Sequence, residues 1–280
     1  MKIENAIQEG FLQLKQNNIE SALLDSQLLM SQIINKDQKF IILNPDKKLQ
    51  NSDYESFKNL ISHRAKGKPV AQLIGVKSFW NYDFSLNDEV LIPRPDSELI
   101  VEQVLKIYKG KKKINLLEIG VGSGCLILSI LKEKKLFSGT GIDISNHCIK
   151  ISNFNAKKLN IQNRVKLFKS DIDNFNLGKY DLIISNPPYI KKLDFNNLKK
   201  DVVNFEPKLA LDGGLEGLSC FRKVIKKSSE LIKKRGRLIL EIAYDQKRDV
   251  AKILKENGFY INRILRDLAN NDRCIVSTKI

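Results

Sequence analysis

The stretch "INLLEIGVGSG", residues 114–124, contains the pattern that decides the fold. Residues 114–119 are mostly apolar and predict a buried strand, and glycines follow at positions 120, 122 and 124. The apolar run after the glycines predicts a helix at about 124–135. A strand that leads through a glycine loop directly into a helix predicts the first half of a βαβ unit.

The alternation of strands and helices continues to the end of the chain. Further strands are expected at 138–143, 164–170, 180–185 and 236–243, and further helices at 146–159, 217–233 and 245–257. No helix separates the last two expected strands, 259–266 and 273–279, so we expect this pair to be antiparallel. The pattern predicts an α/β fold with a Rossmann-like, mostly parallel, doubly wound sheet.

The region before this sheet predicts helices instead. "IENAIQEGFLQLKQ" (3–16) has an apolar helical face formed by Ile3, Ile7, Phe11 and Leu14. "IESALLDSQLLMSQII" (19–34) repeats the spacing, with an expected inner face of Ile19, Leu23, Leu24, Gln27, Leu28 and Ile34. A further helix is expected at 53–65. These segments predict a small helical domain.

Between the helical region and the sheet, the sequence changes character. "FWNYDFSL" and "EVLIP" resemble two strands that meet around Asn87 and Asp88, which predicts a connecting β-hairpin. "PRPDSELIVEQVLKIYKG" (93–110) then has prolines where a helix would begin and a glycine after its end. We therefore expect a helical domain at 1–74, a hairpin linker at 75–93 and a catalytic domain at 94–280.

Composition restricts the classes of function. The chain has 280 residues, 42% of them hydrophobic, and a formal net charge of +16. Only ten of its 48 basic residues are arginine, and the lysines are scattered, so a solvated surface is favoured over a nucleic-acid-binding face, although an anionic partner stays open.

The cysteines and the hydropathy pattern indicate the compartment. The four cysteines are far apart, which predicts neither a metal site nor a disulfide framework and fits a reducing cytosol. The chain has no secretory signal pattern and no run of about 20 apolar residues, so a cytoplasmic protein without membrane contact is expected.

The glycine loop is the first candidate for ligand binding. Glycines let the backbone turn sharply and approach a ligand closely, while the following helix offers free N–H groups. The loop residues are Gly120, Val121, Gly122, Ser123 and Gly124. Their spacing is G-x-G-x-G and differs from the dinucleotide fingerprint G-x-G-x-x-G. A simple tight turn between strand and helix remains an alternative.

Acidic residues follow the next two strands. Asp143 ends the strand after the glycine loop, where a carboxylate is able to accept hydrogen bonds from a ribose diol. Asp171 or Asp173 is placed to accept from the amino group of an adenine, and Ile172 to pack on its ring. This pattern fits any adenosine-type ligand, NAD included. The alternatives are a helix-capping role near Ser145 for Asp143 and an ordinary loop at 171–173.

The most specific pattern is "NPPY" at 186–189, directly after the strand 180–185. Proline fixes its own φ and restricts the residue before it, so Asn186 and Pro187 are both stiff. Pro187 and Pro188 donate no backbone hydrogen bond, which leaves carbonyl oxygens as the available partners. The side-chain oxygen of Asn186 and the Pro187 carbonyl are able to accept from one planar NH₂ group beneath the ring of Tyr189. A stiffened loop without such a guest is the alternative.

These motifs resemble those of the S-adenosylmethionine-dependent methyltransferases that act on planar nitrogens. Further similarity at 75–102, at "NFEPKLALDGGLEGL" (204–218) and at "RDLANNDRCIV" (266–276) makes the chain resemble the bacterial release-factor glutamine methyltransferases, the HemK/PrmC family. The resemblance covers nearly the whole chain. It implies methyl transfer from S-adenosylmethionine to the glutamine side chain in the Gly-Gly-Gln loop of class 1 peptide-chain release factors.

The resemblance also implies roles for individual residues. Residues 120–124 would line the cofactor, Asp143 would hold its ribose, and residues 186–189 would hold the substrate amide. Ile172 stands where many relatives have tryptophan, which keeps an apolar contact without ring stacking, and Glu118 stands where relatives often have aspartate.

Two further segments are expected to support the site. Arg94 would either approach the cofactor carboxylate or, as we prefer, tie the hairpin to the catalytic domain. Residues 204–218 would form a lid behind the substrate loop.

Two rival functions remain. A DNA or RNA adenine amino-group methyltransferase shares the clamp and would explain the basic charge, but the sequence has no separate recognition domain for a flipped base. We therefore expect no direct nucleic-acid substrate. A non-catalytic binding module is the second rival, and the complete set of glycine loop, Asp143 and clamp speaks against it.

Overall fold

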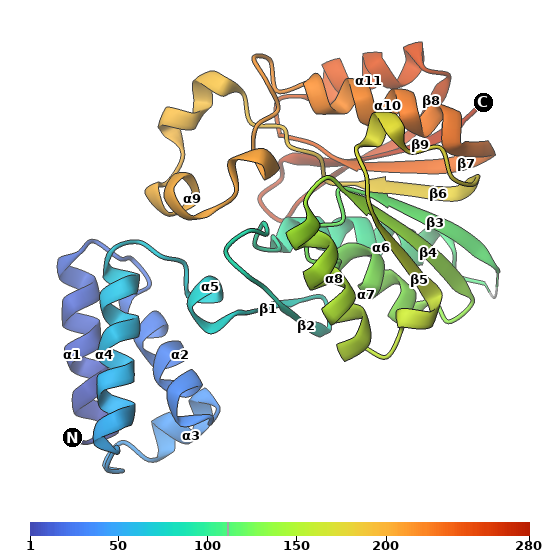
Figure 1. The fold of residues 1–280 in the computed structure, drawn as a ribbon. Coiled ribbons are helices and arrows are strands. Elements are labelled where there is room, and N and C mark those ends of the chain that lie inside the picture. Colours follow the sequence, from blue (N-terminus) through green and yellow to red (C-terminus); the bar gives the residue numbers. More distant parts are fainter. Residues whose placement is uncertain (111) are drawn as a thin grey trace. The chain divides into compact units, whose positions relative to one another are not determined.

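The computed structural model describes residues 1–110 and 112–280 of the chain (Figure 1). These residues form two compact units. One unit consists of residues 1–76 with residues 199–205, and the other of residues 77–198 with residues 206–280. A short segment from the second half of the chain therefore belongs to the N-terminal unit.

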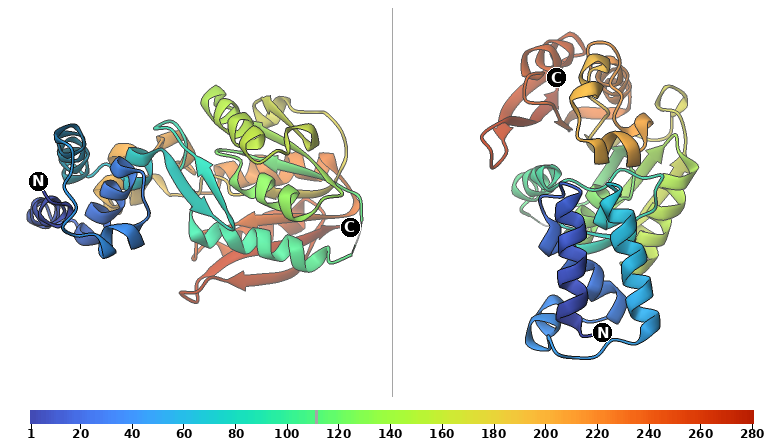
Figure 2. Two further views of the ribbon diagram at one scale, coloured as in Figure 1. Left: turned by 90° about the horizontal axis from the view of Figure 1, so that it is seen from below. Right: turned by 90° about the vertical axis from the view of Figure 1, so that its left-hand side faces the viewer.

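The N-terminal unit is helical, and Figure 2 shows α1 and α4 lying side by side. Its helices are α1 (Ile3–Gln16), α2 (Ala22–Ile34), α3 (Gln38–Leu43), α4 (Asn51–Ala65), α5 (Val70–Ile74) and α9 (Lys200–Phe205). The predicted face of α1 is confirmed for Ile3, Ile7 and Leu14, which are buried in one cluster with Phe57 and Ile61. The α9 segment is bound to this unit by a 2.6 Å hydrogen bond from Gln72 Nε2 to the Phe205 carbonyl.

The inner face predicted for residues 19–34 is confirmed for Ile19 and Ile34, which pack against this cluster, and is wrong for Leu23 and Leu24 of α2. Leu23 and Leu24 are about half exposed, at 48% and 50%, while Asp25 is buried. The reason is a buried ion pair, in which Arg64 Nε of α4 lies 2.7 Å from Asp25 Oδ2. A buried charge requires such a partner, so the pair fixes which side of α2 faces inward.

The hairpin exists, but its predicted turn at Asn87 and Asp88 is wrong. Its strands are β1 (Val76–Phe79) and β2 (Tyr82–Ser85), so the chain reverses at Trp80. Trp80 has a positive φ of 57°, and two carboxylates hold it there. Glu98 accepts from its backbone N–H at 2.7 Å and Glu133 from its indole N–H at 3.0 Å. These partners are distant in sequence, so local pattern did not reveal the turn.

The second unit contains the seven-stranded sheet that the sequence predicts. Its strands are β3 (Ile114–Ile119), β4 (Phe137–Asp143), β5 (Val165–Lys169), β6 (Tyr180–Ser185), β7 (Ile232–Glu241), β8 (Phe259–Arg266) and β9 (Asp272–Lys279). Their order is β5-β4-β3-β6-β7-β9-β8. The first five strands pair in parallel, and β9 is antiparallel to both β7 and β8 as expected.

Helices cover both faces of this sheet (Figure 1). They are α6 (Glu98–Ile107), α7 (Cys125–Glu133), α8 (Asn146–Lys158), α10 (Ser219–Leu231) and α11 (Lys247–Glu256). Successive strand residues point to opposite faces. Thus Leu116 of β3 packs in one core with residues of α6 to α8, whereas Leu117 packs in the other core with residues of α10 and α11. The doubly wound α/β prediction is confirmed.

Short 3₁₀ turns complete the unit. They are Pro95–Ser97, Gln162–Arg164, Ile172–Asn174, Lys192–Asn197 and Lys208–Ala210. Among the helices of residues 1–110 and 112–280, none is both long and apolar enough to cross a membrane. The strand order reverses at β3, between its neighbours β4 and β6. In open α/β sheets, ligands bind beyond the carboxyl ends of the strands at such a point.

Candidate active site

A cavity of about 400 Å³ lies at this position of the second unit. Residues at the carboxyl ends of β3, β4 and β6 line it, together with the loop after β5 and residues from α10. The lining includes eight of the residues that the sequence singled out: Gly120, Gly122, Asp143, Asp171, Ile172, Asn186, Pro187 and Pro188. Segments distant in sequence therefore meet where the sheet topology predicts a ligand.

The glycine loop opens toward this cavity at two positions. Gly120 and Gly122 have positive φ angles of 77° and 53°, and a Cβ on either would meet no atom within 4 Å. The backbone N–H groups of Gly120 and Val121 both donate to the Ile142 carbonyl, at 2.9 and 3.0 Å. The loop is thus fixed to β4, and its open side is bare backbone that a ligand is able to approach.

The remaining candidate residues of this region, in the loop and just before it, are turned away from the cavity. Val121 and Ser123 are each 2% exposed, and Glu118 is 1% exposed. Glu118 Oε2 accepts from the Ile127 N–H of α7 at 2.9 Å, and burial raises the pKa of this carboxyl well above its ordinary value. Gly124 is the N-cap residue before α7, and a Cβ there would lie 2.8 Å from Leu128 Cδ1. These four residues therefore contact other parts of the protein and do not line the cavity.

Asp143 connects the two loops that form one wall of the cavity. Its Oδ2 accepts from the Gly122 N–H and its Oδ1 from the Ser145 N–H, each at 2.9 Å. Burial raises the pKa of Asp143, and the two N–H donors oppose that effect. Ser145 is itself the N-cap of α8, since its side chain accepts from the Cys148 N–H. The side chain that caps α8 is therefore that of Ser145, and the alternative role of Asp143 as the helix cap does not apply.

The loop after β5 provides the next part of the cavity wall. Asp171 Oδ1 accepts from the Asp173 N–H at 2.9 Å, and Ile172 packs against the α10 side core. Asp173 is occupied elsewhere, in a 3.0 Å ion pair with Lys223. Of the two acids, Asp171 is the one that lines the cavity.

Asn186 lies at the end of β6, anchored from two sides. The hydroxyl of Ser185 donates to the Ile119 carbonyl at 2.7 Å, which holds β6 to β3. Asn186 Nδ2 donates to Ser97 Oγ at 3.1 Å. Pro187 is buried and Pro188 half-buried. The two prolines thus form a stiff frame on which the Asn186 amide faces the cavity.

Tyr189 does not line the cavity. Its hydroxyl donates to Glu241 Oε1 at 3.2 Å, and burial together with the Glu241 charge raises the pKa of the phenol. The backbone after it is paired with the segment 211–214. Ile190 exchanges hydrogen bonds with Leu211 and Gly213, at 3.0 and 2.9 Å.

The segment expected as a lid therefore packs directly behind the proline loop. Gln246 Nε2 donates to the carbonyls of Tyr189 and Gly217, at 3.1 and 3.0 Å. Pro207, Leu209 and Ala210 of the same segment line the cavity.

Arg94 pairs with this segment as well. Its guanidinium donates through Nη2 to Glu206 Oε1, and the Glu206 side chain is 1% exposed. Glu206 Oε2 is also buried and has no hydrogen-bond partner among the described residues. We expected Arg94 to have a structural role and to tie the hairpin to the catalytic domain. The contact agrees with a structural role, and the partner is the segment 206–218.

Sequence reasoning missed three polar side chains behind the site. Ser97, Glu241 and Gln246 are 3%, 1% and 2% exposed. Glu241 ends the apolar strand β7 beside β6, and an acid at the end of a buried strand next to the proline loop was a usable signal. Ser97 carried no such signal, because only the fold brings residues 97 and 186 together.

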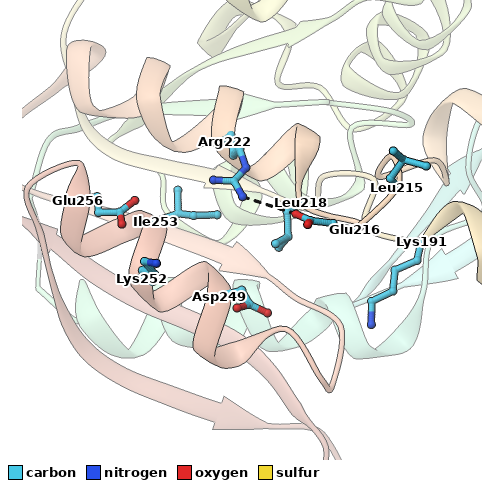
Figure 3. A pocket seen from close by; sticks show the side chains of 9 residues that line it. All are labelled: Lys191, Leu215, Glu216, Leu218, Arg222, Asp249, Lys252, Ile253 and Glu256. Atoms are coloured by element: carbon cyan, nitrogen blue, oxygen red, sulfur yellow. Dashed lines mark ion pairs between the residues drawn. The ribbon is translucent and has the colours of Figure 1, made fainter.

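A second, larger hollow of about 520 Å³ lies beside α10 and α11 (Figure 3). Its side chains carry both charges, and the Arg222 guanidinium lies 3.7 Å from Glu216. It includes neither the glycine loop nor the proline loop. Its walls offer long, exposed side chains instead of backbone donors and buried polar groups, so we place the chemistry in the smaller cavity.

Comparisons with known proteins agree with this geometry. Residues 5–75 match the PrmC N-terminal domain family, and residues 95–215 match the methyltransferase small domain family. The sheet order and the cavity at its switch point thus belong to a methyltransferase, and S-adenosylmethionine is the methyl donor of this class. Full-length relatives narrow the class further. The chain belongs to the family of release factor glutamine methyltransferases.

Two relatives and one solved structure illustrate the range of similarity. The release factor glutamine methyltransferase of Clostridium botulinum is 36% identical over 282 residues, covering 100% of both chains. The bifunctional methyltransferase of Rickettsia bellii is 30% identical over 98% of this chain, which spans only 54% of that protein. The crystal structure of ribosomal protein L11 methylase from Lactobacillus delbrueckii subsp. bulgaricus has a TM-score of 0.50 and 19% identity, covering 68% of this chain and 82% of that one. It supports the fold alone.

Proposed function

We propose that this protein transfers a methyl group from S-adenosylmethionine to the side-chain amide nitrogen of the glutamine in the Gly-Gly-Gln loop of class 1 release factors. The observation that carries the proposal is the placement of Asn186 on the cavity wall, with its NH₂ group bound to Ser97. Its side-chain oxygen then remains to accept a hydrogen bond from a planar NH₂ group. The full-length relatives named for this reaction support the choice of substrate.

The cavity fits S-adenosylmethionine in size and chemistry. Small-molecule sites are typically a few hundred Å³ with apolar walls and a few placed polar groups. Asp143 would accept from the ribose diol, and the bare backbone at Gly120 and Gly122 would lie against the methionine part. Ile172 and Val224 would enclose the adenine, with Asp171 as acceptor for its amino group. When bound, the cofactor supplies an electrophilic methyl group on a positively charged sulfur.

The protein's own groups act on the amide nitrogen. This nitrogen is a weak nucleophile because its lone pair is delocalised into the carbonyl. Asn186 Oδ1 and the Pro187 carbonyl would each accept one of its N–H groups, which orients the nitrogen and favours positive charge on it. The proline frame fixes both acceptors before the substrate arrives, so little entropy remains to be lost on reaching the reactive geometry. As the bond from the methyl group to nitrogen forms, its bond to the cofactor sulfur would break and leave a neutral thioether. The nitrogen would give up one proton to water, because this scheme assigns no side chain as a general base.

Two further roles belong to the same proposal. The helical unit, residues 1–76 with 199–205 in place of the expected 1–74, would recognise the release factor, and the other unit, residues 77–198 with 206–280 in place of the expected 94–280, would carry out the methyl transfer. Gly120, Gly122, Asp143, Asp171, Ile172 and residues 186–188 would contact the cofactor or the substrate amide, while Val121, Ser123, Gly124 and Tyr189 would support them without lining the cavity. Because release factors act in translation, a cytoplasmic location is part of the proposal.

The test is methyl transfer from labelled S-adenosylmethionine, with purified release factor and duplex DNA offered in parallel. We expect label on the release factor only, and its loss in Asn186→Ala. Asn153→Ala is the matched control, because the Asn153 amide donates to the Ile149 carbonyl of its own helix and, within residues 1–110 and 112–280, does not line the cavity. Label on DNA alone would support the adenine alternative. Cofactor binding without transfer to either acceptor would contradict both.

A further inference from the structure

Three polar side chains from separate elements form a chain of hydrogen bonds that ends at the cavity. Ser97 Oγ donates to Glu241 Oε2 at 2.5 Å, and Asn186 Nδ2 donates to Ser97 Oγ at 3.1 Å. Ser97 follows the hairpin, Asn186 follows β6 and Glu241 ends β7. Of the three, only Asn186 lines the cavity. Ser97 and Glu241 therefore act on a bound molecule only through Asn186.

The direction of these hydrogen bonds follows from the groups themselves. An ionised carboxylate only accepts, so the single hydroxyl proton of Ser97 is committed to Glu241. The Ser97 oxygen then offers only lone pairs to Asn186, and it is the NH₂ end of the amide that meets them. The two ends of an asparagine amide are nearly equal in shape, so their partners decide which end faces the cavity.

We propose, on the basis of the function above, that Glu241 and Ser97 are positioning residues that hold the Asn186 oxygen toward the substrate amide. Without them the Asn186 amide is free to rotate by half a turn. Its NH₂ group would then face the NH₂ group of the substrate, two donors would meet, and the clamp would lose one acceptor.

Glu241 is itself held in place from the other side. The Tyr189 hydroxyl donates to its second oxygen at 3.2 Å. Burial raises the pKa of Glu241, while Ser97, the nearby Arg273 guanidinium and Tyr189 favour its ionised form and Asp96 opposes it. Arg273 is fixed in turn by ion pairs with Asp267 at 3.0 Å and Asp96 at 3.6 Å. The carboxylate thus has a partner for each oxygen and a cation nearby.

The first experiment removes the middle of this chain with Ser97→Ala. We expect kcat for release-factor methylation to fall on the order of ten- to hundredfold, as small misplacements of a reacting group do. The Kd for S-adenosylmethionine should stay within about twofold, because Asp143 and the glycine loop are unchanged. Ser97→Thr keeps the hydroxyl and should restore most of kcat. An unchanged kcat in Ser97→Ala would overturn the proposal.

Ser277→Ala is the matched control. Ser277 is also a fully buried serine, and its hydroxyl donates to the Leu238 carbonyl at 3.1 Å, away from Asn186. It should lose stability to a similar degree and keep kcat. If both alanine variants lower kcat equally, Ser97 acts only through stability and the proposal fails.

A second readout does not depend on activity. In the free enzyme, we expect the Asn186 side-chain NH₂ signals, assigned through Asn186→Ala, to be protected from hydrogen exchange and to lose protection in Ser97→Ala and in Glu241→Ala. Protection that persists in both variants would refute the hydrogen-bond chain. Inactivity of the wild type toward release factors would instead end the proposed function, while the exchange result would still decide the role of Ser97.

Discussion

Gly122 shows how a single backbone position is able to make a binding wall. Its φ of +53° is costly for any other residue, and the space beside it is open to the cavity. Its N–H also holds Asp143 at 2.9 Å. Conformation thus favours glycine here, and the open space leaves the backbone bare toward the cavity, whereas at Gly124 both the φ of +82° and the packing against Leu128 favour glycine.

Gly122→Ala should therefore weaken cofactor binding more than it weakens the fold. The left-handed backbone costs on the order of 1–2 kcal/mol for a non-glycine residue. The added methyl group would occupy the cavity, and we expect the Kd for S-adenosylmethionine to rise roughly tenfold or more, measured by titration. The control is Gly110→Ala, where a Cβ meets no atom within 4 Å and φ is not in the left-handed range. Equal affinities of the two variants would contradict the assignment.

Glu118 provides a test in which pH is the variable. Burial, reinforced by the charge of Asp143, raises the pKa of this carboxyl in the folded state, while the Ile127 N–H opposes the shift. Below the ordinary pKa of 4.5 both folded and unfolded states are protonated. Above it, folding must either keep a proton or bury a charge, so stability falls as pH rises toward the raised pKa.

Glu118→Gln removes that penalty and keeps an acceptor for Ile127. Relative to the wild type, its free energy of unfolding should rise as pH increases from 4.5 through this window, measured by urea denaturation at several pH values. A difference that does not vary with pH would show that Glu118 titrates normally.

Individual site residues were predictable where they belong to a short motif that directly follows a strand. The glycine loop, Asp143 and "NPPY" each follow a strand directly, and strand ends meet at one edge of a parallel sheet. Ser97 was not predictable, and neither was its contact with Glu241, because that contact joins residues 144 positions apart. For the same reason, burial of Asp25 by Arg64 could not be read from the α2 pattern.

Among the elements, the segment 206–218 packs directly against the proline loop. Its backbone pairs with Ile190, and at Gly217 a Cβ would lie 2.5 Å from the Tyr189 carbonyl oxygen. Sequence reasoning predicted a lid from this segment but not how tightly it packs. The strands were predicted within a few residues, and β3 and β6 at their observed bounds, because these two are mostly apolar runs bounded by turns. The hairpin turn was misplaced because carboxylates from α6 and α7 determine it.

Gly217→Ala tests the contact between this segment and the proline loop. Displacing the segment moves the backbone at Tyr189, so we expect kcat to fall roughly tenfold, measured with release factor as acceptor. Gly258→Ala is the control, because Gly258 has a similar φ of +76° but its Cβ would meet only the mobile end of Lys279. If the two variants lose the same activity, backbone strain explains the effect and contact with the proline loop does not.

For the molecule as a whole, the cavity belongs to one of the two compact units. Every residue that lines the cavity belongs to residues 77–198 or 206–280. The family and the α/β fold were predictable from the sequence, because their motifs extend over most of the chain. The membership of residues 199–205 in the helical unit was not predictable, since it depends on the contact between Gln72 and Phe205.

Asp25→Ala tests this division. It leaves Arg64 buried without its partner, and breaking a buried ion pair costs about 3–5 kcal/mol. We expect the helical unit to melt earlier and the KM for release factor to rise, while the Kd for S-adenosylmethionine stays unchanged. Asp46→Ala removes the exposed pair with Lys2 and should change neither the melting of the helical unit nor the KM for release factor. A loss of cofactor binding in Asp25→Ala would show that the units do not act separately.

The decisive measurement is the position of the transferred methyl group. After reaction with S-adenosylmethionine, a class 1 release factor is digested and its peptides are mapped by tandem mass spectrometry. We predict one added methyl group, on the side chain of the glutamine in the Gly-Gly-Gln loop, absent with Asn186→Ala and strongly reduced with Ser97→Ala. A methyl group on any other residue, or full modification by Asn186→Ala, would contradict the account of the site.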